Sequence, residues 1–458
     1  MMMNSMATAA LRTLLGERLA HDLPTRSQYG RGEGLAAGMP PDLVAFPVST
    51  AEVAAIAAIC TAHRVPMIGS GACTSLEGHV AAPQGGLAIN FGQMNRVLAV
   101  NAADLDCSVE AGVTREQLNT GLRDQGLFFP IDPGANASLG GMAATRASGT
   151  NAIRYGTMLH NVLGLTVVQP DGGILHTGGR ARKSAAGYDL TRLYVGSEGT
   201  LGIITEITLR LYGIPEHIAA ATCVFETVLD AVQTVVQLVQ LGVPLARVEF
   251  LDDAQIRACN AYSHLGLPEK NHLFFEFHGS PAATAEHAAA AQAVAAENGG
   301  AALQWAATSE AHNQLWKARH NAYYAARALR PDAQVWTTDI CVPVSHLADA
   351  VIAARNDIDA NGLTAPIVGH VGDGNFHVLF VLDPADPEAR VRAEQVYARM
   401  IEHALACGGT CTGEHGIGMV KRGSLLKEHG AEGVAVMRAI KHTLDPLGLM
   451  NPGKIFLD

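Results

Sequence analysis

The chain of 458 residues has few charged side chains, few aromatic ones and no long apolar run. Charged residues make up 16% and aromatic residues 5%, whereas apolar residues reach 48%. This balance is typical of a folded protein with large interiors and excludes a disordered chain. No stretch approaches about 18 uninterrupted apolar residues, so we expect no membrane-spanning helix. Because one core rarely holds so long a chain, we expect two or three domains.

Basic residues and paired cysteines are also scarce. The chain has 32 Lys and Arg against 43 Asp and Glu, which gives a net charge of -11. Nucleic acids and anionic membrane surfaces bind clustered Lys and Arg, so both are disfavoured as main partners. The 8 cysteines form neither a dense disulfide scaffold nor a C-x-x-C pair, and the N-terminus lacks the pattern of a secretory signal. We therefore expect reduced thiols and a cytoplasmic location.

Two common nucleotide-binding motifs are absent, although glycine is abundant with 48 residues. No G-x-G-x-x-G and no G-x-x-x-x-G-K-[ST] follows a predicted strand, which disfavours nicotinamide and P-loop nucleotide sites. Three segments are nevertheless rich in small residues: 69–75 after a predicted strand at 65–68, 128–157, and 195–212. Backbone amides of such loops can bind phosphate, and small side chains allow close approach of an extended cofactor. Flexible surface loops are the alternative.

The segment "IVGHVGDGNFHVLF", residues 367–380, places two histidines around a glycine-rich turn. Asp373-Gly374 favours a two-residue type I′ turn, and a hairpin centred there sets His370 directly opposite His377. Opposed side chains in an antiparallel pair have Cβ atoms about 5 Å apart, so both rings can reach one metal ion. Two buried histidines bonded to the backbone are the alternative interpretation.

A third metal ligand is available in "GEHG", residues 413–416. Glu414 would complete a site of two histidines and one carboxylate, which is used by Zn, Mn and non-haem Fe. Because consecutive side chains diverge, His415 would then be available as a general base. A solvated loop with a chance Glu-His pair is the alternative.

Arg319 is the candidate for binding a substrate carboxylate. The segment "NQLWKARHNAYYAARAL", residues 313–329, predicts a helix with Trp316, Arg319 and Tyr323 on one face. An arginine there either pairs with an acidic neighbour or binds a carboxylate of the substrate through two hydrogen bonds. The periodicity does not distinguish these roles.

The chain resembles a known family nearly from end to end, through "DPGANASLGGMAAT", "SGTNAIRYGTM", "RKSAAGYDLTRLYVGSEGTLGIIT", "RVEFLDD", "GTCTGEHGIGM" and "LDPLGLMNPGKI". It is similar to FAD-linked D-2-hydroxy acid dehydrogenases, above all the cytochrome-linked D-lactate dehydrogenases, and to flavin subunits of glycolate oxidase. The resemblance implies an α+β fold. It predicts a two-part α/β FAD-binding domain of the p-cresol methylhydroxylase and vanillyl-alcohol oxidase type at 1–213, an antiparallel-sheet substrate domain at 214–408, and a C-terminal helical segment at 409–458 that returns to the FAD.

The resemblance also assigns site residues. His370, His377 and Glu414 match the ligands of one divalent metal, Zn or Mn; His415 matches the base and Arg319 the carboxylate binder. The residues expected to contact FAD are Ser70, Gly71, Ala72, Cys73, Thr74, Ser75, Asp132, Pro133, Ser138, Gly141, Gly149, Asn151, Gly156, Glu198, Gly199, Ile204 and Asn451.

Four positions qualify the comparison with the family. Thr74 appears where covalent relatives have the tethering histidine, so we expect non-covalent FAD. Cys73 and His79 replace glycines that are usual in the pyrophosphate loop, and Arg146 replaces another, which predicts a strained or altered loop. Arg146 could equally offset the phosphate charge.

The implied reaction is oxidation of a D-2-hydroxy acid to the 2-oxo acid, with electrons passed to a cytochrome- or quinone-type acceptor. Hydroxyglutarate-oxidising relatives have Lys and Asn where this chain has Thr337 and Leu379. We therefore expect a short monocarboxylate, D-lactate first, with glycolate, D-mandelate and D-2-hydroxyglutarate as alternatives. A homodimer and a peripheral association with a membrane through the acceptor are further expectations. A metal-dependent hydrolase without flavin and a non-catalytic flavin-binding subunit are the rival interpretations.

Overall fold

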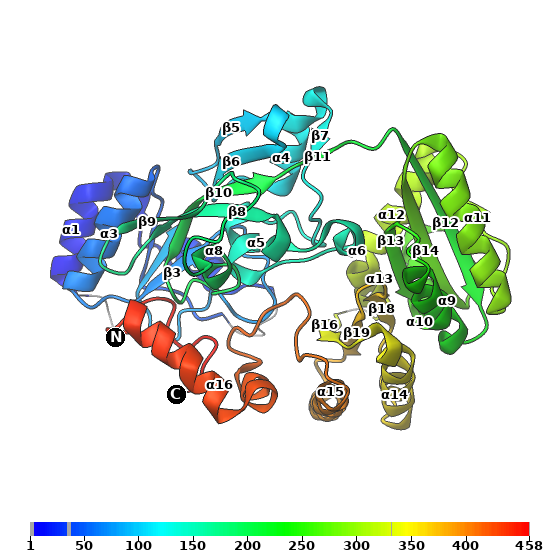
Figure 1. The fold of residues 1–458 in the computed structure, drawn as a ribbon. Helices are drawn as coiled ribbons and strands as arrows, with labels where there is room; N and C mark the ends of the chain where they lie inside the picture. The colour runs from blue at the N-terminus through cyan, green and yellow to red at the C-terminus, as the bar shows by residue number, and fades with distance from the viewer. Residues whose placement is uncertain (1–3, 34–37, 331, 458) are drawn as a thin grey trace. The chain divides into compact units, whose positions relative to one another are not determined.

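The computed structural model describes residues 4–33, 38–330 and 332–457, and the chain forms two compact units (Figure 1). The first unit comprises Met1–Ser148, Gly156–Ile214 and Glu414–Asp458, and the second comprises Gly149–Tyr155 and Pro215–Gly413. The second unit thus includes a short segment from the N-terminal half of the chain, residues 149–155. The first unit includes the C-terminal segment from residue 414 onward. The sequence did not predict the exchange of 149–155.

The first unit contains a mixed four-stranded sheet in the order β1 (Leu19–Ala20), β2 (Leu43–Ala45), β4 (Leu87–Asn90) and β3 (Met67–Ser70). The helices α1 (Ser5–Leu15) and α3 (Thr50–Ala62) pack side by side (Figure 1), and their apolar side chains share one core with this sheet. The hydroxyl of Ser49 caps α3 by accepting from the backbone N–H of Glu52.

A second, antiparallel sheet of the first unit has the order β5 (Val97–Asn101), β6 (Asp106–Glu110), β10 (Ile203–Arg210), β8 (Val162–Val168) and β9 (Ile174–Gly178). Alternate residues of β10 face its core, which also takes in α5 (Leu139–Thr145). After α16 (Arg422–Leu444) the chain returns to the first sheet, where Met450 pairs with Met67. The C-terminal segment therefore lies beside the loop that follows β3.

The second unit is built on an antiparallel sheet. Its strands, in spatial order, are β15 (Gln304–Trp305), β12 (His217–Phe225), β14 (Asn271–Gly279), β13 (Leu245–Leu251), β18 (Ile367–His370), β19 (Asn375–Leu382) and β16 (Gln334–Thr337), with β17 (Ile340–Cys341) also on β19. In such strands the side chains alternate between the two faces. One face therefore carries a row of polar residues, whose members are Glu276, Arg247, Glu249, His370 and His377.

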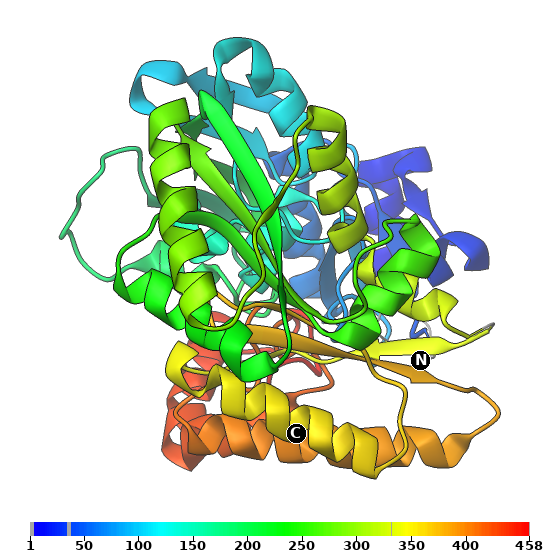
Figure 2. The ribbon, with the colours of Figure 1, turned by 90° about the vertical axis from the view of Figure 1, so that its right-hand side faces the viewer.

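Two groups of helices accompany this sheet. α10 (Asp253–Ser263), α12 (Ser309–His320) and α13 (Ala322–Ala328) pack together and share a core with the same face as the polar row. The second group is α9 (Val228–Gln240), α11 (Pro281–Glu297), α14 (Leu347–Ala360) and α15 (Pro387–Ala406). Figure 2 shows α14 and α15 side by side, in yellow and orange.

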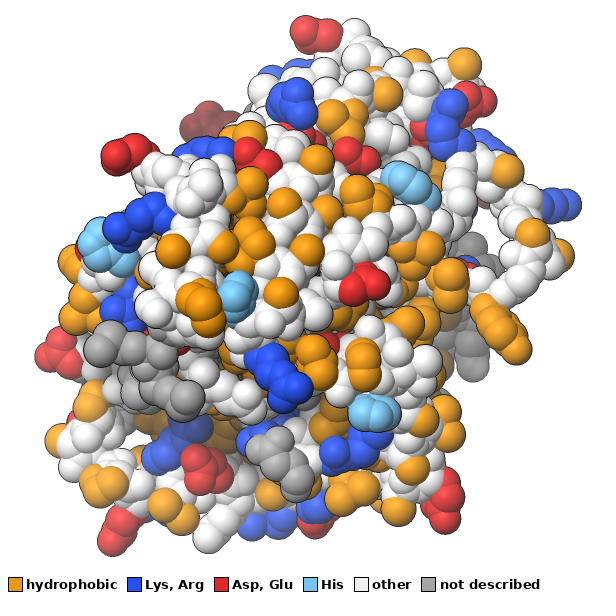
Figure 3. Space-filling view, turned by 90° about the vertical axis from the view of Figure 1, so that its left-hand side faces the viewer, with side chains coloured by type: hydrophobic (Ala, Val, Ile, Leu, Met, Phe, Trp, Pro, Cys, Tyr) orange, Lys and Arg blue, Asp and Glu red, His pale blue; other side chains and the backbone are white. Residues whose placement is uncertain are grey.

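Within the described residues, no helix has the length and apolar character needed to cross a membrane. The face viewed from the side of α1 and α3 mixes apolar, acidic and basic side chains (Figure 3).

Candidate functional site

The two hairpin histidines lie next to each other on one face of the sheet. Their ring centroids are 5.4 Å apart, and a ring nitrogen of His370 lies within 4.8 Å of one of His377. The predicted register is wrong, because His370 pairs with Asn375 and His377 with Val368. Residues 371–374 form a longer turn, in which the N–H of Asp373 donates to the carbonyl of His370. Since the register differs by two residues, both rings keep the predicted face.

Hydrogen bonds set the tautomers of both rings. Nδ1 of His377 lies 2.8 Å from the carbonyl oxygen of Thr338, and Nδ1 of His370 lies 2.7 Å from Oε1 of Glu249. A carbonyl and a carboxylate only accept, so each Nδ1 is the donor. A neutral ring of this kind carries its lone pair on Nε2, the nitrogen that can coordinate a metal. Both rings are buried.

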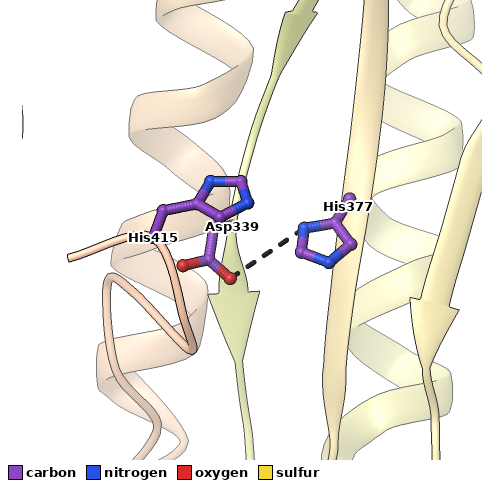
Figure 4. Close-up of side chains that lie close together, drawn as sticks. All are labelled: Asp339, His377 and His415. Carbon is purple, nitrogen blue, oxygen red and sulfur yellow. Dashed lines mark ion pairs between the residues drawn. The ribbon is translucent and has the colours of Figure 1, made fainter. Parts of the chain in front are cut away.

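Asp339 lies beside His377 near the turn, and Figure 4 shows the approach of its carboxylate to the imidazole. Its buried carboxylate accepts from Nδ2 of Asn375 at 2.8 Å and from Oγ1 of Thr412 at 2.7 Å. Oδ1 of Asp339 lies 3.9 Å from Nδ1 of His377. No sequence pattern identified Asp339 as a site residue.

The chain leaves the second unit close to this carboxylate. A Cβ on Gly413 would lie 2.3 Å from Nδ2 of Asn375 and 3.1 Å from Oδ1 of Asp339, so only glycine fits there. Glu414 and His415 come next in the chain and open the segment that belongs to the first unit. Gly413 is therefore the last residue of the second unit.

Arg319 pairs with the carboxylate of Glu249, which no sequence pattern had identified. Its Nε lies 2.7 Å and its Nη2 2.5 Å from Oε2 of Glu249, which is completely buried. The single helix predicted over 313–329 is wrong, because α12 ends at His320 and Tyr323 lies on α13. Glu249 alternates with apolar residues in "RVEFLDD", and an acidic residue on a buried strand is the signal that could have revealed it.

The end of β3 and the loop that follows it contain the first group of predicted FAD contacts, Ser70–Ser75. Cys73 adopts φ +59, so the predicted strain of a side chain in the left-handed region is present there. The same prediction for His79 is wrong, because its φ is not positive. A Cβ on Gly71 would lie 1.9 Å from Oγ of Ser138, which brings two predicted FAD contacts together. The amide of Asn90 donates to the carbonyl oxygens of Ser70 and Gly71 and holds the start of the loop.

A second group of predicted FAD contacts surrounds Glu198, which has φ +55. The amide of Asn451 donates to the carbonyl oxygens of Glu198 and His79. The Glu198 carboxylate accepts from the backbone N–H groups of Ile417 and Gly418 and lies 3.2 Å from Nε2 of His79. Burial alone would raise the pKa of Glu198, but His79 and the two N–H groups outweigh it and lower that pKa.

The other predicted FAD contacts divide between the units. Asp132, Pro133, Gly141, Gly156, Gly199 and Ile204 belong to the first unit, whereas Gly149 and Asn151 belong to the second. Within the second unit, Nε of Arg247 donates to Oδ1 of Asn151 at 3.0 Å. The guanidinium of Arg146, which has φ +57, donates to the carbonyl oxygen of Val195.

The predicted base has a buried acidic neighbour within the first unit. Nδ1 of His415 lies 3.5 Å from Oε1 of Glu77, and Nζ of Lys421 lies 3.2 Å from the same oxygen. Burial alone would raise the pKa of Glu77, but the charge of Lys421 and the neighbouring His415 outweigh it and lower that pKa. Glu77 therefore stays ionised and attracts the proton-bearing side of the imidazole.

Comparisons with known proteins agree with this architecture. A family model described as the C-terminal domain of FAD linked oxidases matches residues 214–455, and one described as an FAD binding domain matches residues 41–178. A probable mitochondrial D-lactate dehydrogenase of Danio rerio is 52% identical over 94% of this chain and 87% of its own length. A mitochondrial D-lactate dehydrogenase [cytochrome] of Arabidopsis thaliana is 46% identical over 97% of this chain and 79% of its own length.

The fold also matches a solved structure. p-Cresol methylhydroxylase with substrate bound superposes with a TM-score of 0.78 at 16% identity, over 99% of this chain and 96% of that one. This match confirms the predicted fold class, an α+β protein with an FAD-binding domain of the p-cresol methylhydroxylase type. Because the oxidase model spans more than half of the sequence and the relatives cover nearly all of it, the chain belongs to the family of FAD linked oxidases.

Proposed function

We propose that the chain is an FAD- and divalent-metal-dependent dehydrogenase that oxidises D-lactate, or a similar short D-2-hydroxy monocarboxylate, to the 2-oxo acid. Its electrons pass to a cytochrome- or quinone-type acceptor. Support comes from the relatives named D-lactate dehydrogenase, which are 52% and 46% identical over nearly the whole chain. A cytoplasmic location, with peripheral membrane association through the acceptor, is part of the proposal.

The observation that carries the metal site is the matched pair of histidines. The Nδ1 atoms of His370 and His377 donate to oxygen atoms of Glu249 and Thr338. In each ring this leaves the Nε2 lone pair available to coordinate a metal. Glu414, one residue beyond the tightly packed Gly413, is the anionic third ligand in this proposal. Two imidazoles and one carboxylate suit Zn or Mn. A cation held there would supply positive charge to the oxygen atoms of a bound hydroxy acid.

The remaining residues bind the substrate and move its proton. Oxidation of a 2-hydroxy acid to the 2-oxo acid removes two hydrogens. The hydroxyl hydrogen leaves as a proton, and the hydrogen on C2 leaves together with two electrons. His415 takes the hydroxyl proton, and the Glu77 carboxylate near its Nδ1 favours the tautomer with an Nε2 lone pair. Arg319, whose Nε and Nη2 face Glu249, binds the substrate carboxylate through Nη1. When bound, FAD supplies the acceptor for the two electrons.

The proposed preference for a short substrate is supported by the surroundings of Leu379. This side chain is buried in the core cluster that includes Trp316 and Phe274. Thr337 pairs with it across β16 and β19, and its buried hydroxyl oxygen has no hydrogen-bond partner within the described parts of the chain. A short substrate with one carboxylate can lie near such apolar atoms, whereas a second carboxylate would need a cation.

A panel of hydroxy acids tests the proposal directly. Purified yellow protein is mixed with D-lactate, L-lactate, glycolate or D-2-hydroxyglutarate, first without and then with an artificial electron acceptor. We expect D-lactate to bleach the flavin absorbance and to give the highest kcat/KM. A colourless protein would favour the metal-dependent hydrolase, and a yellow protein that no hydroxy acid bleaches would favour the non-catalytic subunit.

A further inference from the structure

Glu249 lies between a proposed metal ligand and the proposed substrate-binding arginine. It belongs to β13, where Phe250 pairs with Gly369, so Glu249 lies one position along, beside His370 on β18. Its Oε1 is 2.7 Å from Nδ1 of His370, and its Oε2 is 2.7 Å from Nε of Arg319. The side chain has no exposed surface. Each carboxylate oxygen therefore has its own partner.

Burial makes this arrangement specific. Removing a lone carboxylate from water is unfavourable, and Arg319 offsets this cost because a guanidinium remains charged. The ionised carboxylate has no proton to donate, so it accepts the Nδ1 proton of His370. The neutral ring of His370 then holds its lone pair on Nε2.

We propose that Glu249 is a positioning residue that holds His370 for metal binding and Arg319 for substrate binding at the same time. The inference rests on the proposed function, because it assigns no ligand beyond the metal and the hydroxy acid. Glu249 contacts neither of them and acts through its two partners. A carboxylate that orients a ligating histidine in this way strengthens metal binding about 10- to 100-fold in other proteins.

The test replaces Glu249 by glutamine and measures metal rather than turnover. A glutamine side chain keeps the shape but offers one acceptor and one donor group, so it cannot accept from both His370 and Arg319. With the amide NH₂ toward His370, the ring must place its proton on Nε2, where it blocks coordination. Apoprotein is titrated with Zn²⁺ or Mn²⁺, and FAD per chain is measured in the same samples. We expect metal binding about 10- to 100-fold weaker in E249Q, with FAD content unchanged.

Glu276 offers a matched control on the neighbouring strand β14. It is also a buried carboxylate paired with an arginine and histidines, since it contacts Arg247, His278 and His312. Among the described residues, Glu276 touches none of the proposed metal ligands. E276Q should therefore lose comparable stability and retain metal binding close to that of the wild type.

The outcomes separate this inference from the proposed function. If wild-type protein binds metal and E249Q binds it equally well, the positioning role is wrong and the proposed function stands. Equal loss of metal in E249Q and E276Q would also overturn the role, because it would then reflect general destabilisation. If wild-type protein binds no divalent metal, the metal part of the proposed function fails as well. Should E249Q not fold, E249D decides, since a shorter carboxylate keeps the charge and should bind metal with intermediate affinity.

Discussion

The hydroxyl oxygen of Ser138 lies 1.9 Å from the position that a Cβ would take on Gly71. Both residues are predicted FAD contacts, and Ser138 is buried at the start of α5. An added methyl group must therefore displace Ser138 or the loop, and overpacking of this kind costs about 1–3 kcal/mol. We expect Gly71→Ala to weaken FAD binding about tenfold or more, measured as FAD per chain after dialysis.

Two variants control this measurement. In Gly69→Ala the nearest atom to the new Cβ belongs to Phe91 at 3.9 Å, an ordinary contact, so FAD content should not change. Gly71→Ala combined with Ser138→Ala removes the conflicting hydroxyl and should recover part of the binding. Wild-type FAD content in the single Gly71→Ala variant would show that the contact does not constrain the loop.

Loss of a proposed metal ligand should separate metal binding from flavin binding. His377→Ala removes one coordinating nitrogen, and because loss of an orienting partner alone costs about 10- to 100-fold, we expect turnover to fall at least about 100-fold. FAD should remain bound. Metal analysis and flavin absorbance of the same preparation check both statements. His278→Ala removes another buried imidazole of the same sheet and should keep its metal; undiminished turnover and metal in His377→Ala would contradict the site.

The preference for D-lactate over D-2-hydroxyglutarate should depend on whether a cationic side chain lies near Leu379. A second carboxylate placed there without a cation costs several kcal/mol, so we expect kcat/KM for D-lactate to exceed that for D-2-hydroxyglutarate about a thousandfold. Thr337→Lys supplies a cation across the strand pair and should narrow the ratio. Both substrates are compared with one acceptor. A wild-type preference for the dicarboxylate would mean that another cation serves the pocket.

Lys454 predicts a pH dependence of stability. Burial lowers the pKa of its ammonium from 10.5 to about 8, although it donates to the carbonyl oxygen of Ala81. Between these values the unfolded chain binds more protons than the folded chain, so the free energy of unfolding contributed by Lys454 rises with pH. At pH values below the folded pKa of about 8, Lys454 is charged in both states, so the full free-energy cost of burying the charge destabilises the folded protein.

Urea unfolding from pH 7 to 10.5 measures this effect. Wild-type stability relative to Lys454→Met should rise by up to about 3 kcal/mol as the pH passes through the window. The exposed Lys183, replaced in the same way, should give a curve parallel to that of the wild type. Parallel curves for wild type and Lys454→Met would show that Lys454 titrates normally.

The flavin should be released by acid. The resemblance to the family predicts that Thr74 takes the position of the tethering histidine of covalent relatives, and a threonine hydroxyl does not form that bond. Precipitation with trichloroacetic acid should leave a colourless pellet and a yellow supernatant, measured by absorbance. Colour retained in the pellet would point to attachment through another side chain, with Cys73 and His79 the first to be replaced.

Local patterns in the sequence determined a large part of this protein. The alternation of side chains placed His370 and His377 on one face, the small-residue loops marked the predicted cofactor contacts, and the family motifs predicted the fold that p-cresol methylhydroxylase shares. These features depend on residues close together in the chain, so the sequence displays them directly. Even a two-residue error in the hairpin register left the two rings on the correct face.

Only the tertiary structure decided which partners those residues have. Glu249 is 70 residues from Arg319 and 121 from His370 along the chain, and no periodicity links such distant positions. The turn at 371–374 is longer than its Asp-Gly pair predicts. It packs against the residue that follows β17, since a Cβ on Gly374 would lie 2.0 Å from the carbonyl oxygen of Val342 and the N–H of Val342 donates to the carbonyl of Gly374. A buried carboxylate takes whichever donors the fold brings to it, and its desolvation cost makes that choice strict.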